Sequence, residues 1–333
     1  MKLDETLKHY LIDVDNNLGD LTLKKYTQCL GVLLQLLTTV CTDQRGNSVS
    51  VVDLEQVTTF YLRQCVQHLL TTPVDLASSH GRKPEYGETL APSTVKGYIR
   101  VWKAFFSWCF EEELIDINPA VRLKHPKAPK RIRPAFVAEH IEKMLAVCDT
   151  STLDGFRDKV ILLLLLDTGL RISEISALCV YDVHDTYIKV MGKGRKEREV
   201  GIYPEMSKLL WKYIHKYRAP ANSSEVALFI GRGKRLQAPG IHAIIKRIQK
   251  ASGLEDIKFS AHVFRHTFAK MYLKSGGDLF KLSRQLGHSD VQTTKIYLED
   301  FNSSDARKDH DSFSPLAGID LKRRSKRKKD VEE

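Results

Sequence analysis

The chain has 333 residues, which is long for one hydrophobic core and suits two domains. Its formal net charge of +11 favours an acidic partner, with nucleic acid as the first candidate and a membrane surface as the second. Secretion is not expected, because residues 1–10 do not resemble a signal peptide. The longest aliphatic run covers only residues 160–166, which is too short to cross a membrane. The six cysteines form no C-x-x-C pair, so a zinc cluster is not expected either. These features favour a cytoplasmic protein with reduced thiols.

The first part of the chain has helical apolar spacing. Helices are predicted over residues 21–40, 53–70 and 93–112, and a Gly-, Pro- and Ser-rich loop is predicted around residues 71–92. Ser93 is the predicted N-cap of the third helix. Residues 1–118 are therefore expected to form a helical domain, and they show no catalytic constellation.

The helix over residues 93–112 carries two stripes. One is apolar and predicts a buried face: Val95, Ile99, Trp102, Phe106 and Cys109. The other is basic: Lys96, Arg100 and Lys103. A basic stripe is usually a solvated face. Because this stripe lies beside a basic linker, contact with nucleic-acid phosphates is about as well supported as a solvated face.

The predicted linker covers residues 119–134. It holds four prolines and six Lys or Arg residues but no acid. Proline at this density cannot continue a helix, so the segment is expected to be extended and to follow a polyanion. A solvated linker without a partner is the alternative.

Residues 135–312 are predicted to form a mixed, mainly helical domain. Helices are expected over residues 136–148, around the leucine-rich run and again from about Ile241. Residues 187–204 alternate apolar and polar residues around a Gly-Lys-Gly turn, which predicts a β-hairpin. Residues 313–333 form a C-terminal segment with a basic tail that is expected to be disordered in the free protein.

The stretch SAHVFRHTFA, residues 260–269, predicts a helix with two contrasting faces. Phe264, Phe268 and Met271 share the face that is expected to pack. The opposite face holds His262, Arg265, His266 and Ala269. The cations of this face could bind an anionic ligand, although surface residues with hydrogen-bond partners within the protein are the simpler explanation. For His266 a structural hydrogen bond is expected.

Other charged residues of this domain have structural explanations when they are taken singly. Arg171 follows the buried leucine helix and could simply pair with Glu174. Lys193 lies at the predicted hairpin turn, where lysine is common, and the surrounding residues do not form a phosphate-binding P-loop.

A turn between two helices, called the corner below, is predicted near the end of this domain. Gly287 is expected to end one helix, and Ser289 or Asp290 to cap the next. His288 then lies in the corner, and Tyr297 follows on the second helix, where a single tyrosine is usually a packing residue.

Taken together, these residues closely resemble the active-site series of the tyrosine recombinase (phage integrase) family. The series is Arg171, Lys193, His262, Arg265, His288 and Tyr297, and all six positions carry the usual residue. Tyr297 stands nine residues beyond His288, as in many bacterial members. The stretch SWCFEEELIDINPA, residues 107–120, is also similar to the end of the family's core-binding domain.

The resemblance implies a role for each residue. Arg171 and Arg265 would neutralise the charge that gathers on a phosphate under attack, and His288 would hydrogen-bond the same phosphate. Tyr297 would be the nucleophile and His262 its base, since a free tyrosine with a pKa of about 10 is almost entirely protonated at neutral pH. Lys193 would protonate the leaving 5′-hydroxyl. No metal or cofactor is required, because fixed cations do this work.

The resemblance also implies an architecture and a function. It predicts a two-domain DNA clamp, with a helical core-binding domain, the basic linker and a mixed α/β catalytic domain. The expected activity is site-specific DNA recombination through a 3′-phosphotyrosyl intermediate, in a tetramer on two DNA sites, at the nucleoid and without a membrane partner. Accessory proteins are compatible with it. The alternatives are a type IB topoisomerase, which rejoins the same strand, and a DNA-binding regulator that never cleaves.

Overall fold

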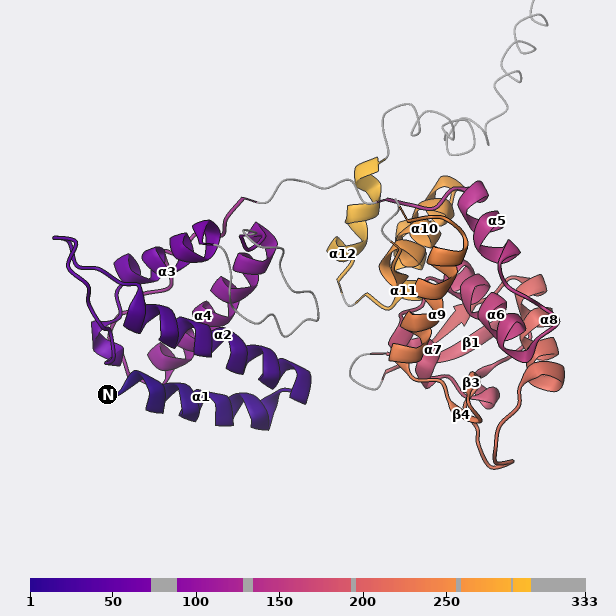
Figure 1. The fold of residues 1–333 in the computed structure, drawn as a ribbon, viewed down its shortest axis with the longest axis horizontal. Coiled ribbons are helices and arrows are strands. Elements are labelled where there is room, and N and C mark those ends of the chain that lie inside the picture. The colour runs from indigo at the N-terminus through magenta and orange to yellow at the C-terminus, as the bar shows by residue number, and fades with distance from the viewer. Residues whose placement is uncertain (73–88, 128–133, 193–195, 256–258, 289, 301–333) are drawn as a thin grey trace, which may run out of the picture. The chain divides into compact units, whose positions relative to one another are not determined.

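The computed structural model describes residues 1–72, 89–127, 134–192, 196–255, 259–288 and 290–300. The chain divides into two compact units, residues 1–131 (the N-terminal unit) and 132–333 (the C-terminal unit). The described residues are mainly helical and contain two antiparallel sheets of two strands each (Figure 1). The predicted fold class, mainly α with a small β-hairpin, is confirmed.

The N-terminal unit is built from helices alone in its described residues. α1 packs along α2, and α4 packs against α1, α2 and α3 (Figure 1). The bounds are α1 Leu3–Asn17, α2 Asp20–Thr39, a 3-10 turn Leu54–Gln56, α3 Thr59–Thr71 and α4 Pro92–Glu111.

α4 provides the centre of this unit's core. The five residues of the predicted apolar stripe are fully buried: Val95, Ile99, Trp102, Phe106 and Cys109. Burying one large apolar side chain stabilises a fold by about 1.5–3 kcal/mol before the entropy of ordering is counted. The indole Nε1 of Trp102 also donates to the Cys29 carbonyl of α2 at 2.9 Å. The stripe is therefore confirmed as the packing face of the helix.

Two local predictions in this unit were wrong. The helix predicted over residues 53–70 begins only at Thr59, because Thr58 is extended and its hydroxyl accepts from the Tyr61 N–H. Ser93 is not an N-cap, because Ala91 takes that position and Pro92 opens the helix. Proline suits the first helical position, where its missing N–H would have had no helical partner.

The first residues of the predicted linker pack with the N-terminal unit. Ala120 and Leu123 are buried in the core of that unit. Residues 123–127 have no regular secondary structure, and residues 128–133 lie outside the described part of the chain.

The C-terminal unit mixes helices with two short hairpins. Its α-helices are α5 Ala138–Ala146, α6 Leu153–Thr168, α7 Ile172–Ala177, α8 Pro204–Lys212, α9 Ala238–Ala251, α10 Ala261–Lys274, α11 Leu279–Leu286 and α12 Gln292–Lys295. A π-helical turn covers Tyr213–Tyr217, and 3-10 turns cover Val180–Asp182 and Ile296–Asp300. The strands are β1 Tyr187–Met191, β2 Glu197–Gly201, β3 Ile230–Gly231 and β4 Lys234–Arg235.

The leucine-rich helix α6 is central to this unit and packs against α8 and α10. It begins where the Thr152 hydroxyl accepts from the Gly155 N–H at 3.0 Å, and it ends at Gly169 with a left-handed φ of 62°. A side chain at Gly169 would place a Cβ 2.6 Å from the Phe268 ring of α10. Glycine therefore lets the chain turn sharply towards Arg171 while α10 packs closely.

The predicted hairpin is present as β1 and β2, which pair antiparallel from Tyr187 opposite Gly201 to Met191 opposite Glu197. Residues 193–195 of its turn lie outside the described residues. The hairpin β3–β4 was not predicted, and two helix limits differ from expectation: α5 covers only Ala138–Ala146, and α9 begins at Ala238 with Pro239 in its first turn.

The predicted packing face of α10 is only partly buried, and part of its cationic face is buried as well. Phe264 is fully buried as expected, but Met271 is 54% exposed, and Arg265 and His266 are only 5% exposed. The reason is tertiary: a second small core covers the cationic side of α10. Its buried residues are Ala269, Leu273, Leu282, Leu286 and Tyr297.

Candidate active site

Arg171 lies at the N-cap of α7, directly after the sharp turn at Gly169–Leu170. Its NH1 donates to Glu174 Oε1 at 3.0 Å, and its backbone N–H donates to Glu174 Oε2 at 2.8 Å. The Arg171 side chain is still 41% exposed, whereas Glu174 is buried. The expected pairing with Glu174 is confirmed, and it leaves Arg171 open to a ligand.

Arg265 lies on the covered face of α10, and its guanidinium is held by neutral acceptors. It donates to the Gly169 carbonyl at 2.9 Å, to the Leu286 carbonyl at 2.6 Å and to the Nε2 atom of His288 at 2.9 Å. Burial and the neighbouring Arg171 lower the pKa of Arg265 to about 10, so it remains charged at neutral pH. In the described part of the chain it forms no ion pair with a carboxylate.

His288 follows the left-handed Gly287 (φ 65°), which ends α11 as predicted. Arginine can only donate, so Nε2 of His288 must accept from Arg265. The proton therefore lies on Nδ1, which faces the hydroxyl of the buried Thr294 at 2.7 Å. Burial, with Arg265 and Arg171 close by, lowers the pKa of His288 to about 4. In this state the imidazole is neutral, and its tautomer is set by its two partners.

Tyr297 lies on the 3-10 turn after α12 and is only 6% exposed. Its ring contacts the His266 ring with a centroid distance of 5.4 Å. Tyr297 also packs in the small core that covers α10, the helix of Arg265. The predicted cap at Asp290 was wrong, because Val291 takes the N-cap position of α12, although the Asp290 carboxylate accepts from the Gln292 N–H at 2.8 Å. The helix is also shorter than expected, since α12 ends at Lys295 and Tyr297 lies on the 3-10 turn that follows. Ser289, the other predicted cap, lies outside the described residues.

The remaining two predicted residues lie differently. His262 is exposed in the first turn of α10, one turn before Arg265. Lys193 falls in residues 193–195, outside the described part of the chain, so its role stays a prediction. The described residues that the structure brings together are thus Arg171, Arg265, His288 and Tyr297.

Arg198 was missed by the sequence reasoning. Its NH1 donates to Glu174 Oε1 at 3.0 Å, and its Nε donates to the Gln285 carbonyl at 2.9 Å. The alternation of the predicted strand was the available signal, because Arg198 shares the inward face of β2 with the buried Val200.

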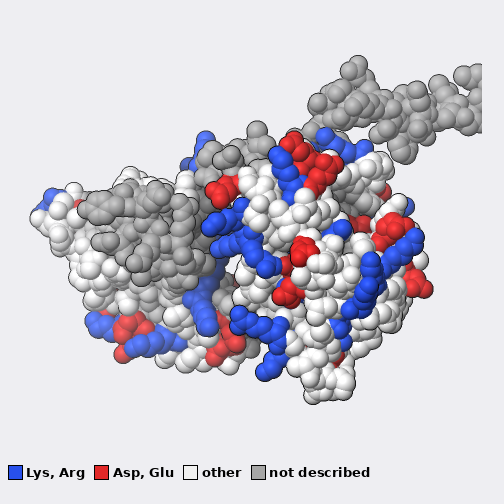
Figure 2. All heavy atoms as spheres, turned by 45° about the vertical axis from the view of Figure 1, so that its right-hand side comes forward, with Lys and Arg blue, Asp and Glu red and all other residues white. Residues whose placement is uncertain are grey.

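The site as described is strongly cationic. The guanidinium groups of Arg171 and Arg198 pair with the Glu174 carboxylate, and the charge of Arg265 lies near enough to interact with all three. On the face of the C-terminal unit that Figure 2 shows, by contrast, Lys and Arg groups lie among Asp and Glu groups. A buried excess of positive charge is costly without a counter-ion, so the site is suited to an anion such as phosphate.

The predicted DNA-contacting stripe lies on α4 of the N-terminal unit. Lys96 and Arg100 are exposed, and Lys103 is half-buried with its Nζ 3.4 Å from the Val121 carbonyl. Desolvation and these three cations, Lys103 first, lower the pKa of His125. The stripe and the start of the predicted linker therefore form one basic surface.

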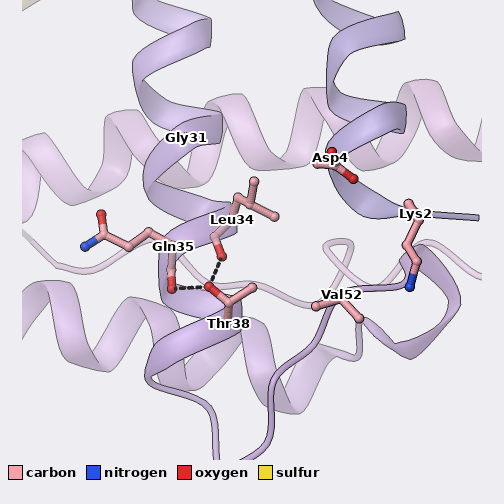
Figure 3. A pocket seen from close by; sticks show the side chains of 7 residues that line it. All are labelled: Lys2, Asp4, Gly31, Leu34, Gln35, Thr38 and Val52. Carbon is pink, nitrogen blue, oxygen red and sulfur yellow. Dashed lines mark hydrogen bonds between the residues drawn. The ribbon is translucent and has the colours of Figure 1, made fainter.

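A groove of about 580 Å³ lies elsewhere, between α1 and α2 of the N-terminal unit. Figure 3 shows the residues that line it: Lys2, Asp4, Gly31, Leu34, Gln35, Thr38 and Val52. None of the predicted site residues borders it. The groove belongs to the N-terminal unit, whereas the arginine site belongs to the C-terminal unit.

The mainly helical fold and the clustered arginines of the C-terminal unit fit a class of enzymes that act on phosphodiesters. The sequence pattern of the phage integrase family matches residues 135–303. The chain belongs to this family and is a tyrosine-type site-specific recombinase.

Relatives and solved structures agree with this assignment. The tyrosine recombinase XerC of Chlamydia caviae is 35% identical over 214 residues, which cover 63% of this chain and 68% of the relative. The tyrosine recombinase XerD of Staphylococcus epidermidis is 28% identical and covers 95% of this chain and 100% of the relative. The solved Tn1549 transposon integrase in complex with circular intermediate DNA has a TM-score of 0.69 at 16% identity and covers 94% of this chain and 99% of that one.

No helix in the described ranges combines the length and the apolar character needed to cross a membrane.

Proposed function

We propose that the C-terminal unit cleaves one strand of duplex DNA by attack of the Tyr297 hydroxyl on a phosphodiester. The observation that carries this proposal is Arg265, a buried cation whose described partners are all neutral. A phosphate that meets Arg265 and Arg171 would supply the missing negative charge. Two planar guanidinium groups match its oxygens and stabilise the charge of the transition state.

The bonds change in a balanced sequence. The Tyr297 oxygen forms a bond to phosphorus while its proton passes to His262 as the proposed base. The bond from phosphorus to the 5′-oxygen breaks, and the leaving hydroxyl receives a proton from Lys193 as the proposed acid. The product is a 3′-phosphotyrosyl enzyme, and attack by the 5′-hydroxyl of a second strand reverses the chemistry and joins the new strand.

His288 would change its partners when the phosphate binds. Its Nε2 accepts from Arg265 in the described state, so it has no proton to give to a phosphate oxygen there. If the phosphate draws Arg265 away, Nε2 is free to take up a proton and then to donate. This supports the proposed role of His288 as a phosphate ligand.

The N-terminal unit would hold the DNA beside the site. We propose that Lys96, Arg100 and Lys103 contact DNA phosphates without regard to base sequence. The two units would form a clamp that is joined by residues 119–134. The proposed domains cover residues 1–118 and 135–312, and residues 313–333 form a C-terminal segment. A solved relative, lambda integrase, is a dimer bound to a core site. By analogy, a tetramer on two recombination sites, in the cytoplasm at the nucleoid, is the proposed working form.

The test is covalent trapping. Binding sites are first selected from the source genome, and a selected duplex is then nicked beside the cleavage point so that the released fragment diffuses away. In EDTA, wild type should give a protein–DNA adduct on Tyr297, and Tyr297→Phe should bind the site equally but form none. An adduct on another residue, such as Tyr272 or Tyr203, contradicts the assignment. Relaxation of supercoiled DNA without exchange between two sites would favour the topoisomerase alternative.

A further inference from the structure

Arg198 joins three elements of the site at one point. It lies on β2, faces inward with Val200, and its side chain is only 14% exposed. Its guanidinium contacts residues of α7 and of the α11 end, so it connects the hairpin to both.

The first connection leads to Arg171. Oε1 of Glu174 accepts from Arg198 NH1 and from Arg171 NH1, each at 3.0 Å. Burial alone would raise the pKa of Glu174, but the hydrogen bonds from Arg198 and from the Arg171 backbone hold it below its usual value. Glu174 therefore stays ionised at neutral pH. Arg198 fixes the carboxylate from one side, and the carboxylate fixes Arg171 from the other.

The second connection leads to the corner that carries His288. Nε of Arg198 donates to the Gln285 carbonyl in the last turn of α11. The guanidinium also packs closely over Gly287, where a Cβ would lie 2.8 Å from Cζ of Arg198. A glycine at this position therefore serves the close approach as well as the left-handed turn. The backbone of residues 285–287, which positions His288, therefore packs directly against the Arg198 side chain.

A simple stabilising ion pair does not account for this arrangement. NH2 of Arg198 is buried and has no hydrogen-bond partner among the described residues. Arg171 and Arg265 already carry positive charge close to it. A third guanidinium adds repulsion and an unmet donor, both of which oppose folding. Its contacts to two parts of the site suggest that geometry, rather than stability, is its contribution.

We propose that Arg198 is a positioning residue that holds Arg171 and the Gly287–His288 corner at a fixed separation, so that both meet the same phosphate. Arg198 acts through Glu174 and the end of α11. The proposal rests on the roles given above to Arg171 and His288.

The experiment measures single-turnover cleavage of the nicked duplex at saturating enzyme, with binding measured separately. Arg198→Met keeps much of the side-chain volume but removes every donor. It should lower the cleavage rate about 100-fold while site binding changes by less than about twofold, because a displacement near 1 Å at a reacting centre can cost that much in rate. Lys189→Met, on the exposed face of β1, is the matched control and should cleave at the wild-type rate.

A double-mutant cycle separates positioning from general support of the fold. Glu174→Gln breaks the link from Arg198 to Arg171, so adding Arg198→Met to it should lower the rate less than tenfold further, which is far from additive. Arg198→Lys can reach Glu174 but cannot bridge to Gln285 at the same time, and should cleave at an intermediate rate. If Arg198→Met melts below the assay temperature, Arg198→Lys and Arg198→Gln carry the comparison.

The outcomes are distinct. A wild-type adduct together with full-rate cleavage by Arg198→Met overturns this inference and leaves the proposed function intact. Additive effects in the cycle, or complete rescue by Arg198→Lys, also overturn it, because a charge or stability role would then suffice. The absence of a wild-type adduct on Tyr297 would instead reject the proposed function itself.

Discussion

The two units handle positive charge in opposite ways. On α4 the cations Lys96 and Arg100 stand on the surface, above a buried apolar stripe. In the C-terminal unit Arg265 and Arg198 are turned inward and held by backbone carbonyls at the end of α11. Exposed lysine and arginine side chains move and are screened by salt, whereas buried guanidinium groups keep one geometry. The first arrangement suits attraction to DNA, and the second suits chemistry at one phosphate.

The largest expected effect comes from the inward cations. Arg265→Met should lower single-turnover cleavage about 100- to 1000-fold, as removal of a donor to a developing oxyanion does elsewhere. This corresponds to about 3–4 kcal/mol of transition-state stabilisation. The slope of the log–log salt dependence of DNA binding should change by no more than the contribution of one neutralised phosphate. Rate measurements at several salt concentrations check both parts, and a tenfold or smaller fall in rate would remove Arg265 from the proposed chemistry.

The outward cations should show the reverse pattern. Replacing Lys96, Arg100 and Lys103 together by glutamine should flatten the log–log salt dependence of DNA binding by about 0.9 for each phosphate that is no longer neutralised, thus by about two to three. Cleavage of saturated substrate should stay near the wild-type rate. The control replaces Lys8, Lys24 and Lys25, on α1 and α2, by glutamine. Equal slopes for both triple variants would return the α4 stripe to an ordinary solvated surface.

A smaller effect is expected at Thr294. Thr294→Val keeps the shape of this buried side chain but removes the partner of His288 Nδ1, so the tautomer is no longer held. Cleavage should fall roughly tenfold, in line with about 1–1.5 kcal/mol for one hydrogen bond. The exposed neighbour Thr293→Val is the control. The proposal for the tautomer fails if the two variants cleave alike.

The smallest effect concerns stability and pH. The folded pKa of His288 is about 4 and its unfolded value is near 6.5, so between these values the unfolded state binds more protons. Stability of the DNA-free protein should therefore fall as the pH drops from 6.5 towards 4. With screening at this half-buried site the contribution is about 1 kcal/mol, or roughly 2–4 °C in Tm.

Thermal unfolding between pH 4 and 7 tests this, because His288→Gln should lose less stability than wild type over that range. His242→Gln, which changes an exposed histidine on α9 of the same unit, is the control and should follow the wild-type curve. Parallel curves for all three proteins would show that His288 is not buried as a neutral group.

The same contrast explains how much the sequence could predict. Helical spacing identified the buried stripe of α4 correctly, because that face packs within one compact helical unit. For α10, spacing separated a cationic face from an apolar one but did not predict that Arg265 and His266 are buried. Periodicity ranks faces by polarity but does not reveal that α11 and the turn of Tyr297 cover the polar one. Gly287 was predicted from the local turn alone, whereas the place of Arg198 depends on residues 24 and 87 positions away.

The oxygen atom that Glu174 shares between two arginines has an evolutionary consequence. Replacing Glu174 by the shorter aspartate would withdraw the acceptor from Arg171 and Arg198 in one step, and a charge reversal at either arginine would place a second carboxylate beside that of Glu174. Single changes at these three positions are therefore coupled. The trio should drift through natural sequences as a unit, with compensating replacements appearing together, whereas each lysine of the α4 stripe is free to vary alone.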